Sequence, residues 1–397
     1  PDDVLYKRLI TLKEMGINAL RTTHNPFSPE FYSMCDTLGI MVMDEVFDGW
    51  WTAKAEFDYG LYFDKWWKQD LTDFIKRDQN HPSVVIWSLG NEVRGFTAEQ
   101  QKEIIDFAKK VDDTRPYTQG HGYIAPHLDI AGFNGDGEKR GVLEKYHKNN
   151  PDKAIIGTEI THTLQTRGVY RTQTWYRTKD NPAPWERPHQ FKKLEPQVFK
   201  IPNLSDEEVF TGITKKYQSS YDNSIVRIGV RDDWNRVEEL DYYLGNFRWT
   251  GFDYLGESFG WPARTANFGI IDLAGFPKDH YYLYQSLWSD KPMVHMLPHW
   301  THTGKEGVEI PVVVYTNCES AELFLNGKSL GEKTMTSERQ LVWKVPYQKG
   351  ELKIVAKNDS SPVVEKIFKS AGKATKVNLK TDKATIQANK TDVANIE

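Results

Sequence analysis

The sequence HPSVVIWSLGNE, residues 81–92, joins an almost unbroken apolar run to a polar Gly-Asn-Glu ending. A run such as Val84–Leu89 is typical of a parallel strand that is covered on both faces. The pair His81-Pro82 ends the helix before it, because the residue preceding a proline disfavours the α conformation. Parallel strands need long crossover connections, usually helices, so this stretch predicts an α/β fold.

The same alternation of helices and strands extends over residues 1–290. Helices are indicated at residues 2–15, with Asp2 or Asp3 as its cap, at 29–38, at 64–79 and after the capping box of Thr97 and Gln100. Strands are expected at Ile17–Thr23, Ile40–Val46, Val84–Leu89, Tyr117–His121, Leu128–Phe133, Ala154–Thr158 and Gly245–Asp253. A closed (β/α)8 TIM barrel has eight strands, and this chain opens on a helix. We therefore expect a TIM barrel at 1–290 whose first strand lies upstream of Pro1.

Three other segments depart from this pattern. Residues 163–232 are irregular, rich in Tyr, Trp, Arg and Pro, and too long for an ordinary connection. One short strand could lie within them; such loops are usually functional or disordered, and at the active face of a barrel they often shape the substrate pocket. From residue 291 apolar and polar residues alternate, and Asn326-Gly327 is a strong hairpin signal. We expect a small immunoglobulin-like β-sandwich at 291–370. The Lys- and Thr-rich residues 373–397 read as the start of a further β domain or as a linker.

Composition excludes several classes of function. The 397 residues carry 51 Lys and Arg against 55 Asp and Glu, which gives no general electrostatic reason to bind nucleic acid or an anionic membrane. No apolar run approaches the ~18 residues of a spanning helix. Cys35 and Cys318 supply neither a disulfide framework nor a metal cluster. Aromatic residues make up 13%, and such side chains suit stacking on sugar rings as well as core packing. Oligomeric state is left open.

Two glutamates follow directly after apolar strands. Glu92 ends the quoted stretch, and Glu159 follows the strand Ala154–Thr158. Barrel enzymes place their chemistry at the carboxyl ends of the strands. Glycoside hydrolysis needs two carboxyl groups, one to protonate the leaving oxygen and one to attack the anomeric carbon or activate water. Either glutamate alone could be a surface residue or an ion-pair partner, but the pair favours glycoside hydrolysis.

The quoted stretch, with NALRTTHNPFSPEFYSMCDTLGIMVMDE at 18–45, resembles glycoside hydrolase family 2. That family contains β-galactosidases, β-glucuronidases and β-mannosidases. The resemblance implies that Glu92 is the general acid/base and that Asn91 hydrogen-bonds the sugar 2-hydroxyl. It also implies that Glu159, in IIGTEITHT, is the nucleophile, followed three residues later by His162. Because the family retains anomeric configuration, the two carboxyl groups should lie ~5–5.5 Å apart.

By the same resemblance Arg21, His24 and Trp249 are expected to bind substrate, and Asp44, Glu45 and His121 are candidates because they also end strands. Arg21 would orient the nucleophile, and Trp249 would form a platform under the sugar. A structural role remains open for Asp44 and Glu45, which could instead hold Arg21, and core packing remains open for Trp249.

The sequence also departs from the family pattern. A tyrosine that holds the nucleophile is expected after the sixth strand, where Phe133 and Asn134 stand instead. Either a tyrosine from 163–232 replaces it or Glu159 is held differently. The magnesium-binding stretch of some β-galactosidases is replaced by VFDGWW, and Asp48 alone is too little. We therefore predict no required cofactor; a divalent cation is possible without support from a motif.

The sugar is the least determined element. Glucuronidases of the family carry Asn-x-Lys near the last strand, whereas TANFGI at 265–270 has no lysine. We expect a retaining exo-β-glycosidase that acts on terminal β-D-galactosides, in an oligosaccharide or glycan. A β-glucuronidase or β-mannosidase is the alternative, and so is an inactive carbohydrate-binding or scaffold fragment. The compartment is left open; a periplasmic or secreted location would suit a glycan-degrading enzyme.

Overall fold

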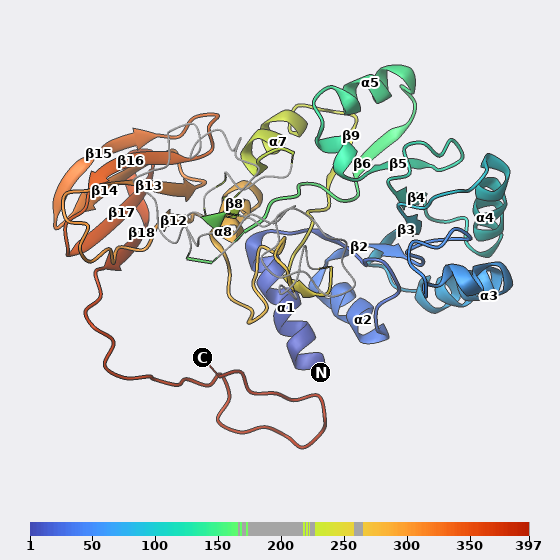
Figure 1. The fold of residues 1–397 in the computed structure, drawn as a ribbon, viewed down its shortest axis with the longest axis horizontal. Coiled ribbons are helices and arrows are strands. Elements are labelled where there is room, and N and C mark those ends of the chain that lie inside the picture. Colours follow the sequence, from blue (N-terminus) through green and yellow to red (C-terminus); the bar gives the residue numbers. More distant parts are fainter. Residues whose placement is uncertain are drawn as a thin grey trace, which may run out of the picture.

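The computed structural model describes residues 1–165, 167–168, 172–173, 217–218, 220, 222, 227–257 and 265–396. Most of the insertion expected at 163–232 therefore lies outside the described residues. The molecule has two lobes, an α/β lobe that begins at α1 and an all-β lobe made of β12 to β18 (Figure 1).

The α/β lobe is built on seven parallel strands. They are β1 Ala19–Arg21, β2 Met41–Glu45, β3 Val84–Asn91, β4 Tyr117–Gly120, β5 Ile130–Phe133, β6 Ala154–Gly157 and β9 Tyr243–Asn246. One sheet has the order β1-β2-β3-β4 and the other β5-β6-β9, with every pair parallel and β4 beside β5. This order confirms the predicted TIM barrel and gives seven of its eight strands.

Helices cover the outside of these strands (Figure 1). They are α1 Asp2–Met15, α2 Pro29–Leu38, α3 Gly60–Asp78, α4 Ala98–Val111, α5 Val142–Asn149, α7 Val230–Val237 and α8 Asp279–Trp288, with the 3-10 turn η1 Gly135–Glu138. Two short antiparallel pairs complete the lobe: β7 Thr172–Gln173 with β8 Tyr217–Gln218, and β10 Tyr254–Leu255 with β11 Thr265–Ala266.

Local sequence signals account for most helix boundaries. Both bonds of the capping box are present, with the backbone N–H of Gln100 donating to Thr97 and that of Thr97 donating to the Gln100 side chain. The predicted Asp2 or Asp3 cap is wrong, because α1 already begins at Asp2. Both carboxylates lie in its first turn, where the positive end of the helix dipole stabilises their negative charge.

The last barrel strand begins earlier than predicted. It was expected at residues 245–253 but occupies Tyr243–Asn246. The following backbone still runs beside β6, because Phe247 N–H donates to Gly157 and Phe247 C=O accepts from Ile160 N–H. These bonds place Trp249 at the carboxyl ends of the strands.

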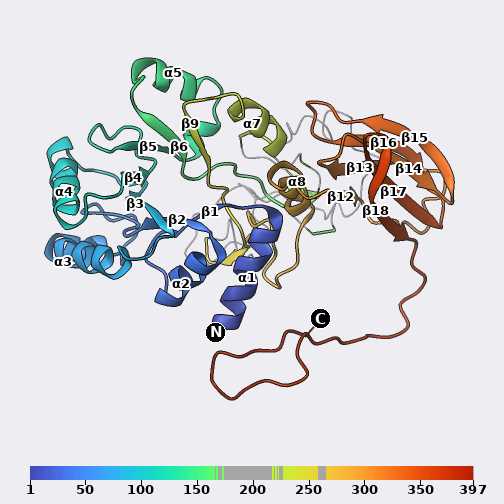
Figure 2. The same cartoon turned by 180° about the vertical axis from the view of Figure 1, so that it is seen from behind.

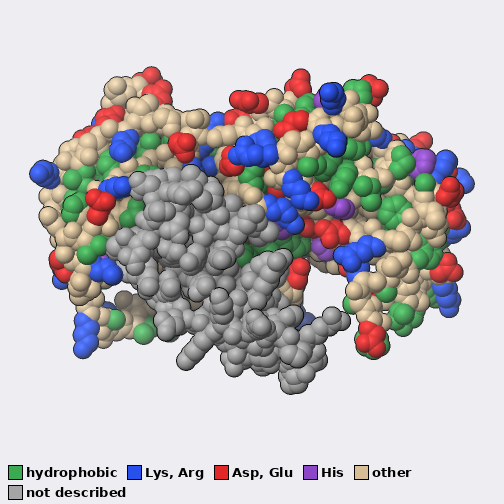
Figure 3. Space-filling view, turned by 45° about the horizontal axis from the view of Figure 1, so that its top comes forward, with side chains coloured by type: hydrophobic (Ala, Val, Ile, Leu, Met, Phe, Trp, Pro, Cys, Tyr) green, Lys and Arg blue, Asp and Glu red, His purple; other side chains and the backbone are tan. Residues whose placement is uncertain are grey.

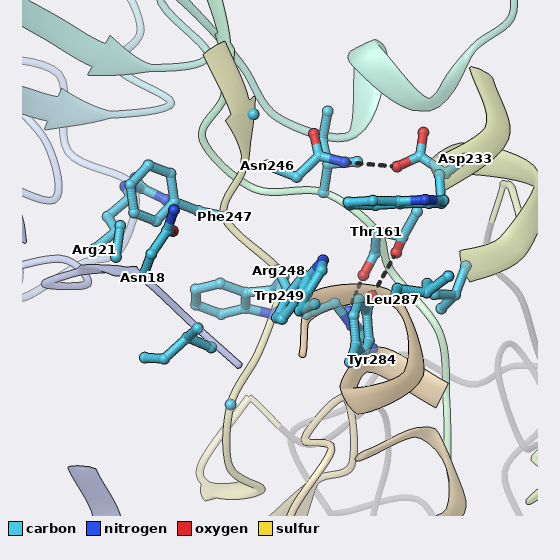
Figure 4. Close-up of a pocket in the computed structure, with 18 of the residues that line it drawn as sticks. Asn18, Arg21, Thr161, Asp233, Asn246, Phe247, Arg248, Trp249, Tyr284 and Leu287 are labelled. Carbon is cyan, nitrogen blue, oxygen red and sulfur yellow. Dashed lines mark hydrogen bonds between the residues drawn. The ribbon is translucent and has the colours of Figure 1, made fainter. Parts of the chain in front are cut away.

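No described strand lies between β1 and β9. Within the described chain, β1 pairs only with β2 and β9 only with β6. A cavity of about 600 Å³ lies between them, lined by residues on both strands and by parts of α1, α7 and α8. Arg21, Phe247 and Trp249 border this cavity (Figure 4).

The second lobe is a β-sandwich, as predicted. One sheet has the order β12-β13-β16, with bounds Val294–Leu297, Glu309–Thr316 and Leu341–Pro346. The other has the order β15-β14-β17-β18, with bounds Lys328–Thr334, Ser320–Leu325, Glu351–Asn358 and Ser361–Lys369. Asn326 and Gly327, at φ 50° and 79°, make the hairpin turn between β14 and β15.

Residues 373–396 hold an isolated bridge between Thr381 and Ile396 and otherwise run as an extended chain after β18 (Figure 1). Their assignment as the start of a further β domain or as a linker stays a prediction.

The two lobes share one apolar core. Leu12 on α1 and Leu283 on α8 belong to the same buried cluster as Met296 on β12 and Val314 on β13. Helix α8 therefore lies between the barrel and the sandwich, as both ribbon views show (Figures 1 and 2). No helix of the described residues is long and apolar enough to cross a bilayer. On the face in Figure 3, the described acidic and basic side chains are interspersed.

Candidate active site

Arg21, at the end of β1, is the centre of a buried polar network. Its Nε and Nη2 donate to both carboxylate oxygens of Glu45, at 2.7–3.0 Å. Its Nη1 donates to Glu159 Oε1 at 3.0 Å, and its Nη2 donates to Asn91 Oδ1 at 2.9 Å. A Cβ at residue 120 would lie 2.4 Å from Nη2, so Gly120 leaves the space that the guanidinium occupies.

Glu159 follows β6 and is almost fully buried. Burial alone would raise the pKa of its carboxyl group, but the hydrogen bond with His162 and the charge of Arg21 outweigh burial and lower the pKa to about 2. Its Oε2 lies 3.6 Å from His162 Nε2, and its Oε1 lies 3.6 Å from His24 Nε2. Among the described residues, Arg21 and His162 therefore keep the carboxylate ionised; most of 163–232, from which a tyrosine could contact it, lies outside those residues.

His162 lies between two carboxylates. Its backbone N–H donates to Glu138 Oε1 at 2.9 Å, and its Nδ1 contacts the same oxygen. Burial would lower the pKa of the imidazole, but hydrogen bonds with Glu138 and Glu159 raise it to about 9. At neutral pH His162 is an imidazolium, so it adds a second positive charge beside Glu159.

Glu92 follows β3 in different surroundings. Its Oε1 accepts a hydrogen bond from Asn134 Nδ2 at 3.0 Å, and the same nitrogen lies 3.3 Å from Asn91 Oδ1. Thr158 Oγ1 donates to Asn134 Oδ1 at 2.8 Å, which fixes the orientation of the Asn134 amide. Glu92 and Glu159 are thus connected through Asn134, Asn91 and Arg21. The spacing of ~5–5.5 Å between the carboxyl groups stays a prediction.

His24 and Trp249 form one wall of the site. Their rings are stacked, with centroids 5.4 Å apart and planes 10° apart. His24 Nδ1 lies 2.7 Å from Glu45 Oε1, and this contact fixes the position of the imidazole ring. Trp249 is half-buried and borders the cavity between β1 and β9 (Figure 4). This position suits a platform under a sugar, and it also suits packing of the indole on the neighbouring Tyr254.

Asp44 and Glu45 are fully buried, which fits the structural role left open for them; contact of either residue with substrate stays a prediction. Glu45 accepts hydrogen bonds from Arg21 and Ser88, so it positions the arginine. Asp44 Oδ1 accepts from the hydroxyls of Thr22 and Tyr32 beneath the site. Burial raises the pKa of Asp44 to about 8.

His121 is not joined to this network by any interaction that the structure records. Its Nε2 lies 3.8 Å from Asp136, and its ring packs edge-on against Tyr123. It shares a second cavity with Glu92. Among the described residues, no group of three or more His, Cys, Asp or Glu side chains could hold a metal ion, and Asp48 is paired with Lys54 at 2.8 Å.

Two residues of the network were missed as functional in the sequence. Asn134 was noted only as a departure from the family pattern, and Glu138, in η1, lies beyond the strand ends on which the search concentrated. The signal for Glu138 could have come from charge balance, since a histidine close to the nucleophile needs a partner on its other nitrogen.

A TIM barrel that connects two strand-end carboxylates in one buried network defines the class of glycoside hydrolases, and comparison with known proteins agrees. Residues 1–182 match the model of the TIM-barrel domain of family 2 glycosyl hydrolases, and residues 307–364 match a domain of unknown function. The chain therefore belongs to glycoside hydrolase family 2.

The names of individual relatives refer to different sugars. A protein of Formosa agariphila named "Putative beta-glucuronidase" is 43% identical over 98% of this chain and 37% of its own length. The beta-galactosidase BoGH2A of Bacteroides ovatus is 36% identical over 98% of this chain and 48% of its length. A solved beta-glycosidase from Bacteroides vulgatus is 53% identical with a TM-score of 0.87, covering all of this chain and 50% of that one. This chain thus spans half or less of these proteins.

Proposed function

We propose that this chain carries the catalytic centre of a retaining β-glycosidase, with Glu159 as nucleophile and Glu92 as general acid/base. The observation that carries the proposal is that two strand-end carboxyl groups belong to one hydrogen-bonded network but have unlike surroundings. Glu159 faces Arg21 and His162, which keep it ionised. Glu92 faces the neutral amide of Asn134. Unequal surroundings are what separates an acid from a nucleophile in such pairs.

The reaction follows from these roles. Glu159 attacks the anomeric carbon, the bond from that carbon to the leaving oxygen breaks, and the proton of Glu92 goes to this oxygen. Water then attacks the glycosyl ester, gives its proton to Glu92, and releases the sugar with its original configuration. Asn91 Oδ1 accepts from Arg21 and Asn134, and its Nδ2 donates to Asp48 Oδ1 at 3.4 Å. In the proposed mechanism the second N–H of this amide donates to a sugar hydroxyl.

For the sugar we propose terminal β-D-galactose. A glucuronide would require a cation for its carboxylate, and the lysine that follows the TANFGI segment does not offer one. Lys278 is 2% exposed, and its Nζ donates to Asp253 at 2.7 Å. β-D-Glucuronide is the second candidate, supported by the name of the relative from Formosa agariphila. β-D-Mannoside is the third.

The test uses the purified chain with 4-nitrophenyl β-galactoside, β-glucuronide and β-mannoside. We expect nitrophenol release, highest from the galactoside, and none above background after Glu159→Gln. A preference for the glucuronide would overturn galactose as the proposed substrate and leave the proposed mechanism unchanged. No release from any of the three, by a chain with a cooperative unfolding transition, would favour the non-catalytic carbohydrate-binding alternative.

A further inference from the structure

Arg248 lies in the segment after β9 and borders the cavity between β1 and β9 (Figure 4). Its side chain is partly buried, and its Nε is buried without a hydrogen-bond partner in the described chain. Burial lowers the pKa of the guanidinium, yet every acceptor recorded for it within the described residues is a carbonyl or hydroxyl oxygen. A cation that is placed among neutral acceptors costs free energy, so its presence calls for a reason.

The acceptors of Arg248 lie on either side of His162. Its Nη1 donates to the carbonyl of Thr161, and its Nη2 donates to the hydroxyl of Thr163 at 2.8 Å. The same Nη2 lies 3.5 Å from the carbonyl of Thr163 and donates to the carbonyl of Phe268 at 3.1 Å. Because His162 lies beyond the end of β6, these bonds fix a segment that follows the sheet.

The peptide group between Thr161 and His162 is held at both of its polar ends. Its carbonyl oxygen accepts from Arg248, and its N–H donates to Glu138 Oε1 at 2.9 Å. In a trans peptide the carbonyl and the N–H point in opposite directions, so this group lies between a cation and a carboxylate. Its dipole is aligned with both charges, which strengthens both hydrogen bonds.

The orientation of this peptide group determines where the imidazole of His162 lies. Its Nδ1 contacts Glu138 Oε1, and its Nε2 lies 3.6 Å from Glu159 Oε2. Burial would lower the pKa of the imidazole, and these two contacts raise it to about 9 instead. A rotation of the peptide group would move the ring away from Glu159, because only a short side chain joins the ring to the backbone.

Tyr284, on α8, contacts both Arg248 and Thr161 (Figure 4). Its hydroxyl lies 3.0 Å from Thr161 Oγ1, and its ring centroid lies 5.9 Å from the guanidinium carbon of Arg248. A cation over an aromatic ring is attracted by the charge distribution of the ring. Tyr284 belongs to the apolar core that the two lobes share, so the guanidinium is supported by a rigid part of the molecule.

We infer that Arg248 is a positioning residue, which holds the peptide group before His162 so that the imidazolium stays beside Glu159. The inference rests on the proposed function, in which Glu159 is the nucleophile. Without Arg248 the peptide group loses the cation at its carbonyl, and the imidazole loses its fixed distance from Glu159. The nucleophile then loses one of the two positive charges that keep it ionised. Arg248 thus acts on the reaction through His162 and without contact to substrate.

The pKa of His162 distinguishes positioning from a simple effect of charge. Removal of a nearby cation would by itself raise the pKa of an imidazole, whereas loss of the carboxylate contacts would lower it. The measurement is a nuclear magnetic resonance titration of protein labelled at histidine, in which His162→Gln identifies the signal. The variants leave the other charged groups around the imidazole unchanged: Glu138, Glu159, Arg21, His24 and Arg227.

Arg248→Met should lower the pKa of His162 from about 9 towards 6.5. Arg248→Lys keeps the charge but has one nitrogen in place of the two that donate to Thr161 and Thr163, so the pKa should fall by less.

Arg115→Met is the matched control for these variants. Arg115 also donates to backbone carbonyls, those of Val84 and Gln79 at 2.7 Å, but it does so at the start of β3. Because the catalytic residues lie at the other end of the strands, Arg115→Met should lower stability and leave the pKa of His162 unchanged.

Activity supplies an independent readout. Arg248→Met should lower kcat for the 4-nitrophenyl galactoside ~100-fold, because a misplaced group near the chemistry costs roughly that factor. KM should change by about threefold at most, because no substrate contact is removed. A kcat within about threefold of that of the unmodified protein would overturn the positioning role.

An unchanged or raised pKa of His162 in the Arg248 variants would also overturn the positioning role. If Arg248→Met does not fold, Arg248→Lys decides alone, because its charge is retained and only lost positioning can lower the pKa. Absence of hydrolysis by the unmodified protein would overturn the proposed function, while the titration of His162 would still decide whether Arg248 positions the imidazole.

Discussion

The surroundings of Glu159 and Glu92 differ although each side chain directly follows a barrel strand. Glu159 is buried among Arg21, His24 and His162, and the pKa of its carboxyl group is lowered to about 2. Glu92 is partly exposed, accepts one recorded hydrogen bond from the amide of Asn134, and borders an open cavity. Equivalent positions in the barrel thus give one carboxyl group that is kept ionised at neutral pH and one that borders a cavity.

This contrast shows that the fold supplies positions and the neighbouring side chains supply roles. Arg21 comes from β1 and His162 from the segment after β6, and both bring positive charge to the same carboxylate. A nucleophile must be ionised before attack, whereas an acid must carry a proton until the bond breaks. The following changes test the two environments separately.

The largest effect is expected from Glu159→Gln, which removes the nucleophile. We expect a loss of ~10⁴-fold or more in kcat, equivalent to about 5.5 kcal/mol. The measurement is nitrophenol release from the aryl glycoside. Glu365→Gln, at an exposed position on β18, is the control and should keep full activity. Residual activity within tenfold of the unmodified chain would remove Glu159 from the mechanism.

Glu92→Gln should have a smaller effect that depends on the leaving group. General acid catalysis contributes ~10²–10⁴-fold, so a disaccharide should lose about that factor in kcat/KM. A dinitrophenyl glycoside needs little protonation and should lose much less at that step. Added azide should then accelerate turnover, because a small anion can replace water without a general base. An equal loss for both substrates would contradict the acid role.

Glu45→Gln should lower stability and activity together. It leaves Arg21 buried without its main counter-ion, and breaking a buried pair in this way costs ~3 kcal/mol. Urea unfolding measures this loss, and kcat should fall about 100-fold, because a misplaced group near the chemistry costs roughly that factor. Glu319→Gln on the sandwich surface is the control. Unchanged stability would show that Glu45 does not hold the arginine.

The smallest effect concerns pH. The pKa of His162 is raised from 6.5 to about 9 in the folded protein, so its stabilising contribution is complete below pH 6.5 and disappears as the pH rises through 9. The pKa of Glu159 is lowered from 4.5 to about 2, so its contribution is present above pH 4.5 and disappears as the pH falls towards 2.

The free energy of unfolding should therefore be highest between about pH 4.5 and 6.5 as far as these two groups are concerned. His162→Gln should flatten the decline between pH 6.5 and 9, which urea titrations at several pH values would detect. A decline of the same slope in the variant would assign it to other groups.

How much of this structure was predictable depends on burial. The strand Val84–Asn91 is apolar on both faces, so composition alone identified it. The hairpin signal at Asn326-Gly327 predicted the turn between β14 and β15. The bounds of β15 and β18 could not be predicted, because their side chains are mostly exposed and polar and form no apolar pattern. Glu92 and Glu159 were placed correctly at strand ends, because the apolar run before each of them identified the strand.

The partners of those glutamates were harder to foresee. Asn134 and Glu138 belong to the network because of where β5 and η1 lie in space, and neither has a sequence neighbour that signals it. Asp44 and Glu45 end a strand, so the sequence left open whether they contact substrate or hold Arg21; in the structure their side chains turn inward to Tyr32 and Arg21. The sequence predicted that both residues lie at the end of a strand, whereas the direction in which their side chains point is determined by packing.

The hydrogen bonds of Arg21 also connect the two parallel sheets of the barrel. Arg21 belongs to the four-stranded sheet, while Glu159 and the carbonyl of Thr158, which accept from it, follow a strand of the three-stranded sheet. A shift of one sheet against the other would separate the guanidinium from the nucleophile. The packing of the two sheets and the charge state of Glu159 therefore depend on the same few contacts.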